Sequence, residues 1–438
     1  MHSWSAPHVP QFPSHISGGS DTVELPELPA LSLYDTADDV IKPVAVPADG
    51  SPVGMYVCGI TPYDSTHLGH AATYVTFDVV NRYLRASGHG VNYVQNITDV
   101  DDPLFERAER DGVDWRELGR EQIDLFRSDM ANLKVIPPQS YIGAIESIDE
   151  VIELVQRLLS KNAAYQLSGE YPDVYADHTF TSQFGYESRY DEKTMLELFA
   201  ERGGDPEREE KRHPLDALLW RAHRPGEPEW DSPFGSGRPG WHVECAAIAA
   251  NRLGDNFAIQ GGGVDLRYPH HEYSAAHVEA GCGSQRMAEH YVHTGMIGLD
   301  GTKMSKSLGN LEFVSVLTAQ GHEPSAIRLG LYAGHYRDDR DWSADVLSEA
   351  EDRLAVWRTA VACEQDPQRV ARLLNSVVER LADDLDTPGV LDCFDQWASD
   401  VTQGIGAAGI TVHESAADDS AAALAVVAAA DSLLGIKL

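Results

Sequence analysis

The chain has 438 residues, of which 42% are hydrophobic, and its 34 basic and 69 acidic side chains give a net charge of −35. This length and composition predict about three domains with buried cores, and because we find neither a secretory signal nor an apolar run of ~20 residues, we expect a cytoplasmic protein. The negative charge argues against a nucleic-acid partner, because proteins bind polyanions through clustered Lys and Arg side chains.

The first third of the chain predicts an irregular arm followed by a βαβ unit. Residues 1–50 are rich in Pro, Ser and His and show no sustained period, so we expect them to add little to the core. The pattern predicts a buried strand over 53–60, a helix over 68–88 and a second strand over 91–100. This order favours a parallel sheet that binds nucleotides at the carboxyl ends of its strands.

The middle of the chain predicts a connection, an insertion and a second half-sheet. Residues from about 104 to 162 have the charged, amphipathic pattern of connecting helices, whereas about 165–235 is turn-rich and predicts an irregular insertion over the active face. Strand patterns return at 256–260 and at 290–297. We therefore expect a second half-sheet there.

The end of the chain predicts a helical domain. Residues 341–438 show no strand alternation and hold 18 acidic and 6 basic residues. The predicted fold class is therefore α/β, a Rossmann-like parallel sheet with an irregular insertion and a C-terminal helical bundle. The expected organisation is an arm at 1–50, a catalytic domain at 51–335 and a helical domain at 340–438.

A first candidate motif, His67-Leu68-Gly69-His70, stands at the predicted helix start directly after a strand. A helix N-terminus offers unpaired N–H groups and the positive end of the helix dipole, and Gly69 allows a ligand to approach the backbone closely. The motif therefore suits a nucleoside triphosphate. The alternative is that these are surface or capping histidines, because so short a motif is permissive.

A second candidate motif, Lys303-Met304-Ser305-Lys306-Ser307, lies in a glycine-flanked loop after the last strand. Two ammonium groups on such a loop can follow negative charge onto a departing diphosphate. A solvated basic loop is the alternative. It is weakened because the chain has only 8 lysines against 26 arginines.

The cysteines indicate a metal site. Five cysteines spread along the chain do not resemble a disulfide framework. Cys58, Cys245 and His270 would give Zn²⁺ three protein ligands and leave a fourth position for a substrate thiol, which serine cannot match. The alternative is that Cys58 and Cys245 are buried small hydrophobic residues.

Taken together, the two motifs resemble the class I aminoacyl-tRNA synthetase catalytic fold, in which they bind ATP and activate an amino acid as its adenylate. The segments CGITPYDSTHLGH, NITDVDD, PLDALLWR, GRPGWHVEC and GGGVDLRYPHHE resemble cysteinyl-tRNA synthetase, in this order, over about 53–310. The resemblance implies one zinc ion per chain, held by Cys58, Cys245 and His270, and ATP with Mg²⁺ as co-substrate. It implies these catalytic residues: His67, His70, Lys303 and Lys306.

The sequence departs from the synthetase pattern at several positions. Ser274 stands where the family has a fourth zinc ligand, CGITPYD replaces CGPTVYD, and Ala72 replaces a basic residue. With ERGGDP at 201–206, these departures resemble the cysteine ligases of mycothiol biosynthesis. That resemblance implies transfer of cysteine from cysteinyl-adenylate to the amine of glucosaminyl-inositol, giving Cys-GlcN-Ins, AMP and diphosphate.

Two other functions remain open from the sequence: a cysteinyl-tRNA synthetase with a reduced C-terminal region, and a catalytically silent zinc- or cysteine-binding module. The expected partners are L-cysteine, ATP and glucosaminyl-inositol, without nucleic acid or membrane, and the expected state is a monomer or weak dimer.

The resemblance also implies a set of substrate- and adenylate-binding residues. Trp241 would wall the cysteine pocket and Asp265 could pair with an ammonium or hydroxyl group, although a core tryptophan and a turn-forming aspartate are the alternatives. The implied set is Gly59, Ile60, Thr61, Thr73, Asn96, Ile97, Thr98, Trp241, Gly263, Val264, Asp265 and Ile297.

Overall fold

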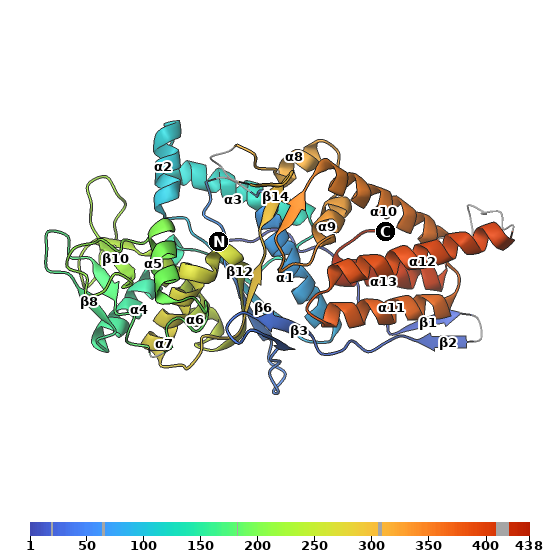
Figure 1. Cartoon of the computed structure of the whole chain (residues 1–438), viewed down its shortest axis with the longest axis horizontal. Helices are drawn as coiled ribbons and strands as arrows, with labels where there is room; N and C mark the ends of the chain where they lie inside the picture. The colour runs from blue at the N-terminus through green and yellow to red at the C-terminus, as the bar shows by residue number, and fades with distance from the viewer. Residues whose placement is uncertain (19–20, 64–65, 182, 305–308, 409–419) are drawn as a thin grey trace.

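A computed structural model describes residues 1–438 except 19–20, 64–65, 182, 305–308 and 409–419. The molecule is elongated, with the insertion at one end, a parallel sheet in the middle and a helical bundle at the other end (Figure 1). The predicted α/β class, with its parallel sheet and helical C-terminal region, is confirmed. Among the described residues, no helix is long and apolar enough to span a membrane.

The central sheet has five parallel strands in the order β13-β12-β5-β6-β7. Its central strands are almost fully buried, as their continuous apolar runs require. The bounds are β5 Val53–Val57, β6 Val91–Ile97, β7 Ser140–Gly143, β12 Phe257–Gly263 and β13 Ala288–Thr294. The two predicted half-sheets meet where β5 pairs with β12, which places their carboxyl ends side by side.

Helices cover both faces of this sheet. On one face, α1 (Leu68–Ala86) begins at the carboxyl edge, and buried residues along most of its length join the largest core. On the other face, helices from the second half of the sheet and from the connection build a second core. These helices are α4 Ile148–Ser160, α6 Trp241–Leu253 and α7 Glu272–Cys282.

The connection and the insertion carry the remaining elements of this half. The predicted helical connection contains α2 (Asp102–Asp111) and α3 (Trp115–Asn132) ahead of α4. The insertion, expected to be irregular, contains α5 (Glu192–Glu201) and a four-stranded antiparallel sheet. Its strands are too short to show alternation in a turn-rich sequence: β8 Ala164–Gln166, β9 Val174–Ala176, β10 Leu218–Ala222 and β11 Gly237–Pro239.

The prediction of an irregular N-terminal arm that adds little to the core is wrong. Residues 1–50 form two hairpins, and Trp4, Ile16 and Leu33 are buried in the main core. Four-residue strands are too short to reveal a period, so the sequence pattern missed them. The strands are β1 His15–Gly18, β2 Asp21–Glu24, β3 Ser32–Asp35 and β4 Val40–Pro43.

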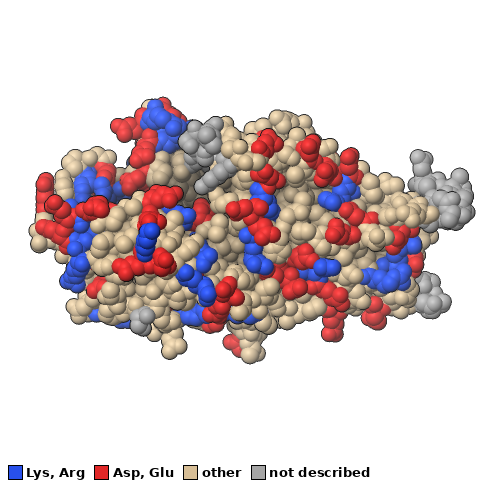
Figure 2. All heavy atoms as spheres, in the orientation of Figure 1, with Lys and Arg blue, Asp and Glu red and all other residues tan. Residues whose placement is uncertain are grey.

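The segment after β13 connects the central sheet to the helical bundle. A small sheet follows β13 and splits the strand predicted over 290–297; it contains β14 (Ile297–Leu299), β15 (Thr302–Lys303) and β16 (Arg340–Trp342). The helices that follow are α8 Val314–Ala319, α9 Pro324–Tyr332, α10 Ala344–Cys363, α11 Pro367–Ala382, α12 Thr387–Ala408 and α13 Ala421–Leu434. Figure 2 shows Asp and Glu side chains at both ends of the visible face, with Lys and Arg side chains among them.

A buried charge cluster joins α1 to the bundle. Asp78 on α1 accepts hydrogen bonds from Arg82 and Arg328 at 2.6 Å each and from the Ile136 amide at 2.8 Å. The two guanidinium groups also donate to backbone carbonyls of Asp431 and Leu434, at the end of α13. Burial opposes ionisation of Asp78, but the two arginines hold the pKa of its carboxyl below the ordinary value.

We predict that Asp78→Ala lowers the free energy of unfolding by about 3–5 kcal/mol, because it leaves two buried guanidinium groups without their counter-ion. Chemical denaturation measures this change. Because the pKa of Asp78 is depressed in the folded chain, its contribution is present above the unfolded pKa and is lost as the pH falls. The loss in Asp78→Ala should therefore shrink in acid.

The matched control is Glu323→Ala, which removes an exposed ion pair with Arg358. It should change the free energy of unfolding by less than about 1 kcal/mol. Equal effects of the two substitutions would contradict a special role for the buried cluster.

Candidate functional site

A cavity of about 330 Å³ opens at the carboxyl ends of β5, β12 and β13. Open α/β sheets bind ligands at this edge. Most of the predicted substrate residues and both motif histidines line it. They are Gly59, Ile60, Thr61, His67, His70, Thr73, Trp241, Gly263, Asp265 and Ile297, and the predicted metal ligand Cys58 lines the cavity too.

The predicted residues Asn96, Ile97 and Thr98 are buried and are absent from the cavity lining. Asn96 accepts a hydrogen bond from the Gly59 amide at 2.7 Å, and the Thr98 amide donates to the Ile60 carbonyl at 3.0 Å. A Cβ atom on Gly59 would lie 1.7 Å from the Asn96 carbonyl oxygen. This segment therefore supports the loop after β5 from behind. Val264 is also absent from the lining.

The first motif forms the start of α1. His67 is the N-cap residue, and its Nδ1 accepts from the Gly69 amide at 3.1 Å. The rings of His67 and His70 stack with centroids 3.8 Å apart, and a Cβ on Gly69 would lie 2.9 Å from the His67 ring. One imidazole thus caps the helix as the alternative interpretation expected, while both rings face the cavity beside the positive helix end.

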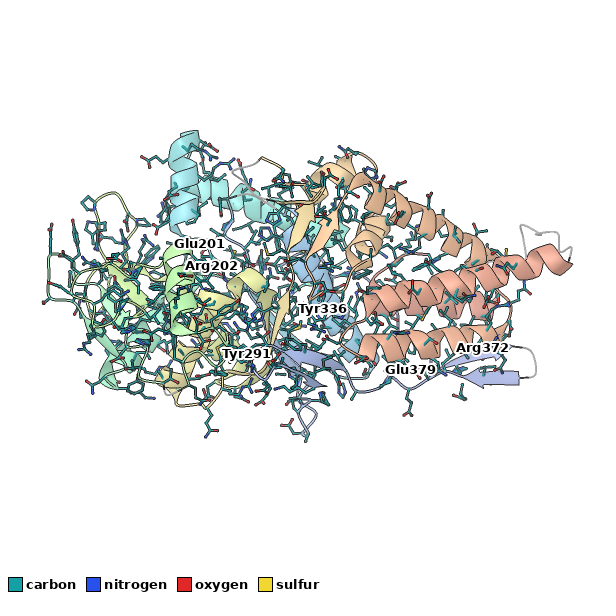
Figure 3. The ribbon with its side chains drawn as sticks, in the orientation of Figure 1. Glu201, Arg202, Tyr291, Tyr336, Arg372 and Glu379 are labelled. Carbon is teal, nitrogen blue, oxygen red and sulfur yellow. The ribbon has the colours of Figure 1, made fainter. Side chains whose placement is uncertain are left out.

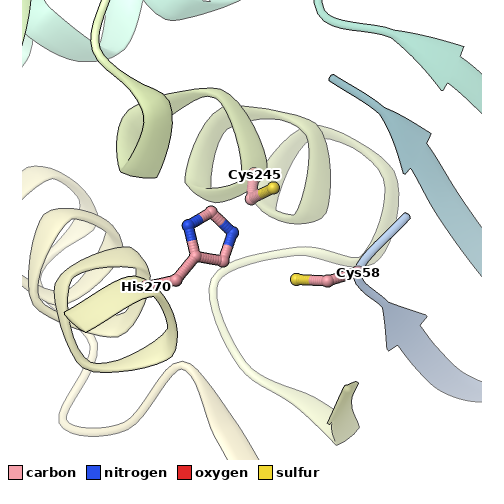
Figure 4. A group of neighbouring side chains, drawn as sticks. All are labelled: Cys58, Cys245 and His270. Atoms are coloured by element: carbon pink, nitrogen blue, oxygen red, sulfur yellow. The ribbon is translucent and has the colours of Figure 1, made fainter. Parts of the chain in front are cut away.

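Three residues from distant elements form a compact group beside the cavity (Figure 4). Cys58 follows β5, Cys245 lies on α6 and His270 lies in the turn before α7. One potential ligand atom from each residue lies within 4.8 Å of the other two, and all three residues are buried. The donor set of two sulfur atoms and one nitrogen fits Zn²⁺ with one position left for a further ligand.

Ring stacking and hydrogen bonds hold His270 and the backbone around it in place. Its ring stacks on Trp241 with centroids 4.4 Å apart, and its Nδ1 lies 3.1 Å from Nδ1 of His242. Ser274, at the position of the synthetase's fourth ligand, donates to the backbone carbonyls of His270 and His242 at 2.8 and 3.1 Å. The Ser274 hydroxyl thus supports the backbone around His270.

The two thiols have opposite tendencies to ionise. Burial, followed by the neighbouring Cys245, raises the pKa of the Cys58 thiol well above its ordinary value. Burial also acts against ionisation of Cys245, but interactions with Cys58 and His270 outweigh it and lower the pKa of Cys245. A cation between the sulfur atoms would favour the thiolate form of both, so the group suits a metal.

A second buried group touches the first and was missed from the sequence. Nε2 of His271 lies 3.2 Å from the Cys58 sulfur, and Nδ1 of His271 lies 2.8 Å from Nε2 of His293. Glu187 lies 3.6 Å from the same His293 nitrogen. Burial lowers the pKa values of His271 and His293, that of His293 to about 3. His271 therefore contacts the predicted ligand Cys58 directly, and His293 lies behind His271.

Further cavity residues were also missed. Tyr63, Tyr74 and Thr294 line the cavity, and the Thr294 hydroxyl lies 2.8 Å from that of Thr73. Met304 lines it too, so the second motif reaches the site through its methionine. Its place inside that motif was the available signal. Of the predicted lysines, Lys303 belongs to β15, and Lys306 lies outside the described residues.

The ERGGDP segment at 201–206 makes hydrogen bonds to residues near the site and within the insertion. Arg202, labelled in Figure 3, donates to the backbone carbonyls of Asp265 and Tyr268 at 2.7 and 2.5 Å. Asp205 accepts from the Tyr175 hydroxyl and, at 3.0 Å, from Lys211. The motif thereby ties the insertion to the segment that leads into His270.

Comparisons with known proteins agree with this geometry. A family model described as the tRNA synthetases class I (C) catalytic domain matches residues 44–352. A protein of Corynebacterium urealyticum named L-cysteine:1D-myo-inositol 2-amino-2-deoxy-alpha-D-glucopyranoside ligase 2 is 74% identical over 440 residues, which cover both chains completely. A Corynebacterium efficiens protein named as the same ligase, without the final number, is 61% identical over 442 residues and also covers both chains completely.

Solved structures show the same fold at low identity. Mycobacterium tuberculosis methionyl-tRNA synthetase in complex with methionyl-adenylate matches with a TM-score of 0.62 and 15% identity, covering 87% of this chain and 89% of the other. A leucyl synthetase, the Agrobacterium radiobacter K84 agnB2 LeuRS in a ternary complex, matches with a TM-score of 0.59 and 12% identity, covering 88% and 84%.

We predict that Arg202→Ala lowers the affinity for Zn²⁺ about 10-fold, because the segment that positions His270 loses two hydrogen bonds. Competition with a chelating dye measures this affinity without any need for activity. The control is Lys193→Ala, which removes an exposed side chain from α5, the helix that Arg202 follows. Unchanged zinc affinity in Arg202→Ala would contradict the positioning role.

Proposed function

The chain belongs to the class I tRNA synthetase catalytic-domain family and, within it, to the L-cysteine:1D-myo-inositol 2-amino-2-deoxy-alpha-D-glucopyranoside ligases, and from this premise we propose how its site joins cysteine to the amino-sugar. The protein is an ATP-dependent ligase that forms a carbon–nitrogen bond. Cysteine and ATP give cysteinyl-adenylate and diphosphate, and the amine of glucosaminyl-inositol then takes the cysteinyl group, which releases AMP. Identity over the full length of the relatives carries this conclusion.

Cys58, Cys245 and His270 would hold a zinc ion beside the cavity. Bound there, zinc supplies a position at which a substrate thiol binds as the thiolate. The chain's own residues shape the space around that position. Trp241 stacks against His270, and the loop at Gly59 is fixed by Asn96, so the cysteine side chain enters a rigid pocket. Serine fits the same volume but lacks the sulfur atom, so it is discriminated by chemistry.

The motif residues act on ATP. His67 and His70 at the start of α1 present ring nitrogens and the positive helix end to the phosphates, and Lys303 and Lys306 neutralise the charge of the departing diphosphate, together with Mg²⁺. The cysteine carboxylate attacks the α-phosphorus in line while the bond to the diphosphate breaks. No protein nucleophile is required, so acceleration comes from positioning and charge stabilisation.

The adenylate lies along the carboxyl edge of the sheet. Thr73, Gly59, Ile60 and Thr61 from the first half of the sheet and Gly263, Asp265 and Ile297 from the second half all line this cavity. The Asp265 carboxylate is suited to the cysteine ammonium, since a charge-assisted hydrogen bond fixes orientation as well as charge. Asn96, Ile97, Thr98 and Val264 act through the loops that they support.

The charge of the chain favours the amino-sugar over tRNA. The net charge is −35, and the C-terminal helical region is itself acidic. A tRNA-binding surface requires clustered positive charge for counter-ion release. A small cationic amine requires no cluster of positive charge. This composition therefore supports the ligase over a cysteinyl-tRNA synthetase.

We predict that Cys58→Ser lowers cysteine-dependent ATP–diphosphate exchange by about 100-fold or more and lowers zinc content, because a hydroxyl is a weak zinc ligand. Cys282→Ser, in a half-buried cysteine outside the site, is the control. Undiminished exchange in Cys58→Ser with zinc still bound would refute the role assigned to the metal.

The acceptor is tested directly. The enzyme is incubated with ATP and labelled cysteine, and either glucosaminyl-inositol or tRNA is supplied. Label is expected in Cys-GlcN-Ins and not in tRNA. Labelling of tRNA alone would overturn the proposed acceptor and leave cysteine activation intact.

A further inference from the structure

A second cavity lies beside the first. It has a volume of about 510 Å³ and is lined by residues of α2 and of the segment from Gly309 to Phe313, which leads into α8. Tyr63 lines both cavities, so they adjoin at this side chain. Such a volume is within the range of small-molecule sites.

Asp101 lies between residues of the two cavities, because it is hydrogen-bonded to Thr61 of the first cavity and precedes Pro103 of the second by two positions. It is the N-cap of α2, and the next turns of that helix contribute Glu106, Arg107 and Arg110 to the second cavity. One carboxylate oxygen accepts from the Asp102 amide at 2.9 Å, and the other accepts from the Thr61 hydroxyl at 3.2 Å. Because Thr61 lines the first cavity, the half-buried Asp101 lies one side chain away from the adenylate position.

We propose that the second cavity is the acceptor site, in which the polyol of the amino-sugar lies against α2 while its amine contacts the Asp101 carboxylate at the edge of the adenylate site. This proposal rests on the proposed function and names the residues that the acceptor meets.

The charges of the second cavity match a polyol with one amine. Arg107 and Arg110 both pair with Asp111, at 2.5 and 3.1 Å, and Glu106 adds a further carboxylate to the lining. The arginine charges are therefore largely balanced, and alternating donors and acceptors remain for hydroxyl groups. A diphosphate would need excess positive charge. The aromatic side chains of Tyr63 and Phe313 add apolar surface for the sugar ring.

Asp101 provides the proton acceptor that the transfer step requires. The ammonium of the acceptor gives one proton to the Asp101 carboxylate, which frees the nitrogen lone pair. The nitrogen attacks the carboxyl carbon of cysteinyl-adenylate, the bond from that carbon to the phosphate oxygen breaks, and AMP leaves. The second proton on the nitrogen passes to water, and Asp101 later returns its own proton to solvent.

The surroundings of Asp101 suit this exchange. Burial and the neighbouring Asp102 raise the pKa of its carboxyl to about 6, against the opposing hydrogen bonds of the Asp102 amide and Thr61 and the charge of Arg238 on β11. Glu244 on α6 also faces this carboxylate. A base with a pKa close to the working pH transfers protons most efficiently in both directions.

The experiment separates the two half-reactions in Asp101→Asn, in which the amide oxygen can still cap α2 and the NH2 group can donate to the Thr61 hydroxyl. Cysteine-dependent ATP–diphosphate exchange should stay within about 3-fold of the unaltered enzyme. Single-turnover transfer from preformed cysteinyl-adenylate to glucosaminyl-inositol should fall about 100-fold or more. The unaltered enzyme should lose transfer rate below about pH 6, and this decline should be absent in Asp101→Asn.

Two further variants complete the test. Asp101→Glu should restore part of the transfer rate, because it keeps a carboxylate. Asp114→Asn alters the N-cap of α3 in the same manner and should leave both half-reactions unchanged. Transfer undiminished in Asp101→Asn, or an equal loss of exchange and transfer, would overturn the proposal. Absence of exchange in the unaltered enzyme would instead refute cysteine activation itself.

The occupant of the second cavity is tested with Glu106→Gln. The KM for glucosaminyl-inositol should rise about 10-fold, because one charged acceptor is lost, while the KM for ATP stays constant. A changed KM for ATP or altered inhibition by diphosphate, with the acceptor KM unaffected, would assign the cavity to the diphosphate and overturn the proposal.

Discussion

The buried contact of Asp78 with Arg82 and Arg328 is the constraint on which the arrangement of the site depends. Asp78 lies ten residues into α1, about 15 Å from the histidine motif that begins the helix. Arg328 belongs to α9, which follows the lysine motif, and both arginines reach the end of α13. Charges in a low-dielectric core tolerate little change in separation. The helix that starts at the ATP site is therefore held in register with the bundle.

Around the reacting groups, several residues that do not line the cavity orient those that do. Asn96 fixes the Gly59 amide, Arg202 holds the carbonyls before His270, and His271 contacts the Cys58 sulfur. These contacts come from β6, from the insertion and from the turn before α7. Holding groups in place before the substrate arrives removes the cost of ordering them during the reaction. The insertion thus contributes to the site without lining it.

The sequence predicted elements and motifs well and side-chain directions poorly. The strands around Cys58 and Asn96 were recognisable because buried apolar runs are bounded by turn residues. The hairpins of the arm were missed, since four-residue strands carry no period and depend on the core that they cover. The family resemblance correctly indicated that Asn96 and Thr98 lie near the site. It did not reveal that they contact the loop after β5 instead of lining the cavity. Arg202 acts on residues 63 and 66 positions away, a distance that no local pattern reveals.

The net charge of −35 affects how the two substrates arrive. A negative field slows the diffusional encounter with free ATP and concentrates small cations near the protein. An acceptor that carries an ammonium group is drawn in by the field that repels the nucleotide. Salt screens both effects within a Debye length. Ionic strength therefore changes the association rates of ATP and of the amino-sugar in opposite directions, so the salt of the medium alters which substrate limits turnover.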